Sequence, residues 1–240
     1  MKVLVLSSLM AKQPQPIDYL SFNAQQGGGE AFVVQRVNVA MTQENVRKRA
    51  EAVNDILLSA WQRKTVRSGR LAMSALVQRI PTVHDLMEGM AAPADVASYY
   101  LAMDPPLSMS EANPDTTTAF ARVETYHRRT PFAKDYPNIT DLESNLGQVC
   151  GGQTERRTAA LVYCALSGYD NGRKVAAYEL EGSDGIGFYE NLGFEQTGNR
   201  PSEKVGDGSV TYVHLQATSI GGVNEQIRTQ YPGLIVPSPI

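Results

Sequence analysis

Apolar residues recur along the chain with two periods, and these periods predict both helices and strands. After Thr42, a residue suited to cap a helix, apolar positions return at the spacing of one helix face: Val46, Ala50, Val53, Leu57 and Trp61. A second helix is predicted over residues 82–90, because Thr82 and Asp85 approximate a capping box after Pro81. A third is predicted over residues 155–166, which contain several alanines and leucines.

Shorter apolar runs, rich in β-branched and aromatic residues, predict strands. They cover residues 31–39, 96–103, 116–126, 139–143, 174–180 and 210–217. In the run 116–126, the small residues Ala119, Ala121 and Val123 alternate with Phe120, Arg122 and Glu124, which predicts a strand with one buried face. The run 71–80 fits a helix or a strand equally well.

The remaining segments predict loops and extensions. Residues 13–30 are polar and end in three glycines, which indicates a flexible loop after a first short strand. Residues 63–70 read as a basic connection, and the proline-containing stretches 104–115 and 128–137 as loops. Residues 219–240 show no period, so we expect a tail that packs along the surface or is disordered. The expected organisation is an extension over 1–30, a main domain over 31–218 and a tail over 219–240.

Composition narrows the class of protein. With 240 residues, 42% of them hydrophobic and 20% charged, the chain is long and apolar enough for a globular core. A net charge of -3 provides no general attraction to nucleic acid or to an acidic membrane surface. Cys150 and Cys164 are too few for a disulfide scaffold and are expected to be free thiols. The first apolar run fits a strand better than a signal peptide, so we expect a cytoplasmic protein, of its own cell or of one into which it is delivered.

The most informative stretch follows the predicted strand 174–180. Ser183 or Asp184 can cap a short helix, Ile186, Tyr189 and Leu192 share one face of it, and Gly193 suits a left-handed helix end. The segment Phe188–Phe194, FYENLGF, resembles the FYxxLGF signature of the GNAT acyltransferases, which transfer an acyl group from coenzyme A to an amine. An ordinary core helix with an aromatic pair is the alternative.

The order of predicted elements also resembles a GNAT domain, most strongly from Ile139 onward. The resemblance implies an α+β (α/β) fold, with a central mixed, mostly antiparallel, twisted sheet flanked by helices. It also implies acetyl-CoA as co-substrate, no metal, and an amine-bearing acceptor that is either a protein or a small molecule. The extensions before Ala31 and after Ala217 are then expected to shape the acceptor groove or a homodimer contact.

A pyrophosphate can be held by backbone N–H groups of a loop that opens a helix, and this requires small residues. Gln148 and Gly151 fit the GNAT pattern Gln/Arg-x-x-Gly-x-Gly/Ala, whereas Gln153 occupies the last small position. The residues that the resemblance and this chemistry assign to the cofactor are Gln148, Gly151, Gly152, Gln153, Thr154, Arg156 and Ser183.

Acyl transfer needs a base for the ammonium proton and an acid for the departing thiolate. The resemblance assigns the acid to Tyr189, because the ordinary pKa of tyrosine, near ~10, lies above that of a thiol, near ~8.5. Three carboxylates remain candidates for the base: Glu143, Asp141 and Glu124.

Other chemistries fit less well. The glycines of the segment 182–187 are in the wrong order for a dinucleotide fold, and the helix that they open is too short. His84, His127 and His214 are scattered, so no metal site is predicted, and no G-x-S-x-G motif occurs. A rival from another class stays open, namely a GNAT-like binding or assembly module without catalysis.

Overall fold

The structure is a computed structural model that describes residues 15–22, 30–37, 42–68, 80–91, 97–104, 116–126, 136–144, 153–199, 203–205, 208–232 and 234. The described helices are α1 (Gln43–Ser68), α3 (Val83–Ala91), α4 (Gln153–Leu166), α5 (Gly185–Asn191) and α6 (Ile220–Gln230). The described strands are β1 (Tyr19–Phe22), β2 (Phe32–Val37), β3 (Ala97–Met103), β4 (Thr117–Tyr126), β5 (Tyr136–Ser144), β6 (Val175–Leu180), β7 (Glu195–Asn199), β8 (Glu203–Val205), β9 (Gly208–Val210) and β10 (Tyr212–Ala217).

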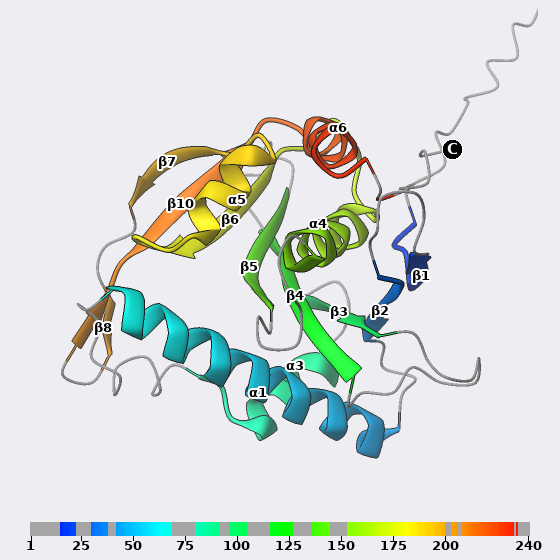
Figure 1. The fold of residues 1–240 in the computed structure, drawn as a ribbon, viewed down its shortest axis with the longest axis vertical. Helices are drawn as coiled ribbons and strands as arrows, with labels where there is room; N and C mark the ends of the chain where they lie inside the picture. Colours follow the sequence, from blue (N-terminus) through cyan, green and yellow to red (C-terminus); the bar gives the residue numbers. More distant parts are fainter. Residues whose placement is uncertain are drawn as a thin grey trace, which may run out of the picture.

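Eight of these described strands form one open sheet in the order β1-β2-β3-β4-β5-β6-β10-β7, while β8 and β9 form a separate hairpin. Every neighbouring pair in the sheet is antiparallel except β5 and β6, which run parallel. Helices flank the sheet, as Figure 1 shows. The predicted mixed, mostly antiparallel sheet with flanking helices is therefore confirmed.

The two faces of the sheet carry different cores. On the first, which we call the α4 face, alternate strand residues such as Tyr100, Ala121 and Ile139 pack with residues of α4, α5 and α6. On the second, the α1 face, Leu101 and Phe120 pack with residues of α1 and α3. The strand alternation predicted for residues 116–126 is confirmed. The prediction that only one face of this strand is buried is wrong, because residues of α1 and α3 also cover Phe120.

The helix ends test the capping predictions. Thr42 accepts a hydrogen bond from the Asn45 N–H at 3.3 Å, which confirms it as a cap. The Thr82 hydroxyl accepts from the Asp85 N–H at 3.1 Å, and the Asp85 carboxylate accepts from the Thr82 N–H at 3.0 Å, which confirms the capping box. Asp184 is the residue at the start of α5, but no side-chain hydrogen bond caps that helix.

Several predicted boundaries were wrong. The connection expected over residues 63–70 is largely helix, because α1 continues to Ser68. The strand β5 begins at Tyr136, inside the predicted loop 128–137. The tail contains α6, which Ser219 caps through the Gly222 N–H and which buries Ile220, Val223 and Ile227 against the α4 face. Most of the ambiguous run 71–80 lies outside the described residues.

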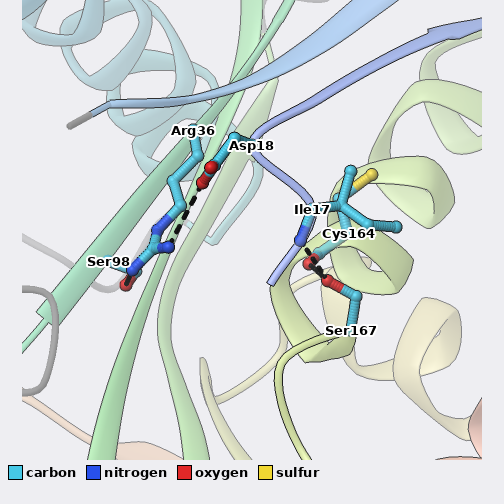
Figure 2. Close-up of polar contacts among 6 residues, drawn as sticks. All are labelled: Ile17, Asp18, Arg36, Ser98, Cys164 and Ser167. Atoms are coloured by element: carbon cyan, nitrogen blue, oxygen red, sulfur yellow. Dashed lines mark hydrogen bonds and ion pairs between the residues drawn. The ribbon is translucent and has the colours of Figure 1, made fainter. Parts of the chain in front are cut away.

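The N-terminal segment is also more ordered than expected, because part of the predicted loop 13–30 is the edge strand β1. Figure 2 shows its attachments. The Ile17 N–H donates to Ser167 Oγ at 2.8 Å, which ties the segment to the end of α4. Arg36 on β2 contacts Asp18 Oδ1 at 3.3 Å and donates to Ser98 Oγ on β3 at 3.2 Å. These contacts connect the N-terminal segment to the sheet and to a helix above it.

Among the residues that the structure describes, no helix is both long and apolar enough to cross a membrane.

Candidate functional site

The parallel pair β5–β6 is short, and its strands then separate. Their register holds only at Asn138–Ala176 and Ile139–Ala177, although β5 continues to Ser144 and β6 to Leu180 (Figure 1). Beyond these two rows β5 pairs with β4 and β6 with β10. We refer to residues 140–144 of β5 and 178–180 of β6 as the parted strand ends.

A β-bulge accounts for the separation. Arg122 of β4 pairs with Asp141 and Val123 with Ile139, so Thr140 is an extra residue in β5. The Thr140 hydroxyl donates to the Arg122 carbonyl at 3.4 Å. A bulge bends the strand that contains it and increases its twist, and here it occurs directly after the last row shared with β6. The described part of the chain supplies no strand partner for the backbone edge of β5 that faces β6 beyond Ile139.

Tyr189 is held on the α4 face by the short helix α5. Its side chain is 1% exposed, and its ring makes edge contacts with Phe188 and Phe194 at centroid distances of 5.6 and 5.1 Å. Leu192 is buried in the same core, and Ile186 packs against it, which confirms the predicted apolar face of this helix. Gly193 ends the helix at φ 85°, the left-handed conformation expected for that glycine.

Glu179 is a site residue that the sequence analysis missed. It lies on β6 within the parted strand ends, is 7% exposed, and accepts a hydrogen bond at 3.0 Å from the Leu180 N–H. A Cβ on Gly185 would clash with its carboxylate, so the carboxylate occupies the space that this glycine leaves. The available signal was an acidic residue between two apolar neighbours, Tyr178 and Leu180, inside the predicted strand.

Glu179 and Tyr189 are neighbours for a geometric reason. Gly185 and Tyr189 are four residues apart and share one face of α5, and helix side chains lean toward the N-terminus. The Tyr189 side chain therefore lies over the turn that contains Gly185, where the Glu179 carboxylate sits. Burial raises the pKa of Tyr189 well above its ordinary value, and the charges of Glu179, Glu143 and Asp141 raise it further. The phenol thus stays protonated and suits a proton donor.

The predicted bases lie on the opposite side of the sheet. Arg122 forms ion pairs with Glu124 and, at 3.8 Å, with Asp141. Its guanidinium also lies 5.7 Å from the centroid of the Tyr99 ring, within the α1-face core. Glu143 pairs with Phe120 across the strands, and paired residues share a face. All the predicted bases therefore belong to the α1 face, and Tyr189 and Glu179 to the α4 face.

The cofactor loop predicted from Gln148, Gly151 and Gly152 lies outside the described residues. Gln153 and Thr154 form the first turn of α4, which begins close after the end of β5. The N–H groups of a first helical turn have no partner within the helix and suit an anion.

The predicted cofactor residue Arg156 is directed back toward β2. Its Nη1 donates to the Glu30 carbonyl at 3.1 Å, and its guanidinium lies 5.5 Å from the centroid of the Phe32 ring. The adjacent Arg157 is 2% exposed and donates to Thr118 Oγ1 at 2.7 Å. The Nη2 of Arg157 also forms an ion pair with Asp104 Oδ1, at 2.9 Å. Both arginines thus pack beside the first turn of α4 and stabilise it.

Ser183, the last predicted cofactor residue, lies in the turn before α5. Its N–H donates to the Leu180 carbonyl at 3.1 Å, while its hydroxyl oxygen is buried and makes no hydrogen bond to the residues that the structure describes. The structure therefore brings Ser183, Glu179 and Tyr189 together around α5, separates them from Asp141 and Glu143 by the sheet, and directs Arg156 elsewhere. Within the described residues, no group of three or more histidine, cysteine, aspartate and glutamate side chains could hold a metal ion.

No family model and no curated protein matches the sequence. Solved structures do match the fold. One is the NatC complex bound to Gag peptide and CoA, at 9% identity and a TM-score of 0.50, covering 78% of this chain and 98% of that chain. Another is aminoglycoside N(6')acetyltransferase from Legionella pneumophila, at 14% identity and a TM-score of 0.49. The match covers 81% of this chain and 95% of that chain.

A third match is an acetyltransferase of the GNAT family from Streptococcus pneumoniae, at 8% identity and a TM-score of 0.47, covering 77% of this chain and 98% of that chain. At sequence identities this low, the matches show a shared fold and nothing about activity. The resemblance first indicated by FYENLGF is confirmed at that level: this chain has the fold of the GNAT acetyltransferases.

Proposed function

We propose that this protein transfers an acyl group, acetyl in the first instance, from coenzyme A to an amine. The observation that carries the proposal is the early end of the β5–β6 ladder beside a buried, protonated phenol. The backbone edge of β5 that no described strand pairs with beyond Ile139 has N–H and C=O groups of the kind that can bind the amides of a pantetheine arm, as an added strand would. A cytoplasmic location, with access to acetyl-CoA, is part of the proposal.

In this proposal the cofactor enters from the α4 face. Backbone N–H groups of Gln148, Gly151, Gly152, Gln153 and Thr154 hold its pyrophosphate at the start of α4. Arg156, in the same turn, contacts the Glu30 carbonyl and the Phe32 ring instead. The unpartnered hydroxyl of Ser183 donates a hydrogen bond to the cofactor near α5.

The chemistry then uses both faces of the sheet. The amine nitrogen attacks the thioester carbon, the C–S bond breaks, and sulfur keeps the electron pair. Glu143 or Asp141, acting through water, takes the proton that nitrogen loses. Tyr189 gives its phenolic proton to the thiolate and is reprotonated from solvent. Glu179 positions the phenol, and its negative charge disfavours a lasting phenolate.

The full burial of Tyr189 favours a second candidate function. A phenol that is 1% exposed cannot reach a thioester unless the cofactor enters between the parted strand ends. If no cofactor enters, the fold serves as a binding or assembly module and Tyr189 is a core residue with a raised pKa.

Acetyl-CoA binding separates the two candidates. A ligand that binds only the native state stabilises it, by about 2.7 kcal/mol at a concentration 100 times its Kd. We therefore expect acetyl-CoA to raise the Tm, and amine-dependent release of the CoA thiol to follow. Tyr189→Phe should retain the Tm increase and lower kcat roughly 100-fold, which is typical for loss of a general acid. No Tm increase would exclude the acyltransferase, and an unchanged kcat would exclude Tyr189 as the acid.

A further inference from the structure

Arg157 has the largest side chain among the fully buried residues that the structure describes. It is the fifth residue of α4, and helix side chains lean toward the N-terminus of their helix. The guanidinium group therefore lies beside the first turn of α4. A buried charge is costly unless it is paired, so the partners of this group bear on what it does.

The partners of Arg157 come from the ends of three neighbouring strands. Its Nη1 donates to Thr118 Oγ1 on β4 at 2.7 Å. Its Nη2 pairs with Asp104 Oδ1, directly after β3, at 2.9 Å, and with Glu30 Oε2, before β2, at 3.6 Å. Its guanidinium carbon lies 5.4 Å from the centroid of the Phe32 ring, at the start of β2. One side chain thus attaches the start of α4 to β2, β3 and β4.

A β-bulge in β4 supplies the shortest of these contacts. Thr117 and Ala119 pair with successive residues of β3, so Thr118 is an extra residue in β4. A bulge re-aims the side chain of the strand that contains it. The Thr118 hydroxyl donates to the Ala102 carbonyl at 3.2 Å and accepts from Arg157, so it is used in both directions. A planar guanidinium makes several such contacts at fixed angles, which a lysine ammonium does not reproduce.

These contacts fix the first turn of α4, the part of the helix that is proposed to hold the pyrophosphate of coenzyme A. The N–H groups of this turn, those of Gln153 and Thr154 among them, have no acceptor within the helix. They bind an anion only where they point, and a displacement of about 1 Å can cost roughly 100-fold in function. Whatever holds the turn against the sheet therefore affects binding of the phosphates.

We propose that Arg157 is a positioning residue for the cofactor. It keeps the first turn of α4 in the orientation in which the N–H groups bind the pyrophosphate, and it does not touch the cofactor itself. The inference rests on the proposed use of coenzyme A and adds to it a residue on which selectivity for a phosphate-bearing ligand depends. Binding of the pantetheine arm, which carries no phosphate, should not depend on Arg157.

CoA and pantetheine separate this role from a general loss of structure, because pantetheine has the same thiol and amides without the phosphates. Kd is measured by calorimetric titration for CoA and by competition with CoA for pantetheine. Arg157→Lys should raise the Kd of CoA by roughly tenfold or more and leave that of pantetheine unchanged. Arg36→Lys is the matched control, since Arg36 also pairs with a carboxylate, Asp18, and donates to a hydroxyl, Ser98, but away from α4. It should change neither Kd.

Asp104→Asn is the milder second variant, because the Asp104 side chain is 50% exposed. If Arg157→Lys does not fold or no longer binds CoA measurably, Asp104→Asn carries the test, and we expect the same selective increase, smaller in size. An unchanged Kd of CoA, or equal increases for CoA and pantetheine, overturns the positioning role.

The failures of the two proposals can be told apart. Loss of the positioning role in this test leaves acyl transfer from coenzyme A intact. If the parent binds CoA but releases no thiol with any amine, acyl transfer fails, while a selective effect of Arg157→Lys still supports the positioning role. If the parent binds no CoA, both proposals are overturned.

Discussion

The two faces of the sheet differ most where β5 and β6 separate. On the α4 face, Tyr189 and Glu179 are buried against α5, and their positions depend on packing. On the α1 face, Arg122, Glu124 and Asp141 are about one-third exposed, and their positions depend on ion pairs. The α4 face thus shields its ionisable groups from solvent, whereas the α1 face presents its charges to it. A two-residue parallel ladder brings both environments to one place.

The largest expected difference between the faces comes from replacing one buried residue on each. Tyr189→Ala removes a ring packed between Phe188 and Phe194 and should lower the free energy of unfolding by about 3–5 kcal/mol. Asn138→Leu keeps the volume and removes an oxygen that has no hydrogen-bond partner among the described residues, so its effect should stay within about 1 kcal/mol and can be stabilising. Urea unfolding of both variants measures the difference. A loss above about 2 kcal/mol for Asn138→Leu would show that its amide supports the fold.

A smaller effect is expected at Gly185, which tests the contact between α5 and Glu179. A methyl group there would clash with the Glu179 carboxylate, so Gly185→Ala should displace that carboxylate and cost about 1–3 kcal/mol in stability. Gly187→Ala is the control in the same helix, because a Cβ at Gly187 meets no atom within 4 Å. It should be neutral or slightly stabilising, since alanine favours helix. Equal effects of the two variants would mean that Glu179 has room to move freely.

The α4-face part of the site was predictable from local sequence. FYENLGF determines a helix face, a buried tyrosine and a glycine exit, and the structure has all three within a dozen residues. Glu179 was missed because its environment depends on Gly185, a residue in the next element whose missing side chain gives no hydrophobic signal.

The arrangement of side chains on the α1 face depends on the register between β4 and β5, which the sequence did not reveal. The alternation of residues 116–126 was predicted, but not that Glu124 faces Asn138 or that Thr140 is bulged. One inserted residue in β5 changes which side chains are neighbours, and no local pattern marks it. The tail was mistaken for a surface segment because the first turn of α6 contains two glycines and the helix is polar on one side. Only its packing in the α4-face core shows it to be part of the core.

The smallest expected effect is a change in alkaline stability, because the α4 face encloses the acidic protons of Tyr189 and Cys164. Burial raises the pKa of Tyr189 and of the Cys164 thiol, both on that face. In the unfolded chain these groups lose their protons near pH ~8.5–10, whereas in the folded protein they keep them. The unfolded state then binds fewer protons, so the free energy of unfolding falls as pH rises above about 9.

Each such group contributes a slope of up to about 1.4 kcal/mol per pH unit once its unfolded counterpart is ionised. We therefore expect Tyr189→Phe to reduce the loss of stability between about pH 10 and 11 by that amount, measured by urea unfolding at each pH. Tyr19→Phe is the control, because the Tyr19 side chain is 50% exposed. If both variants lose stability with the same slope as the parent, the phenol of Tyr189 is reached by water at high pH. The α4 face would then be open between the parted strand ends even without a cofactor, and the contrast between the two faces would disappear.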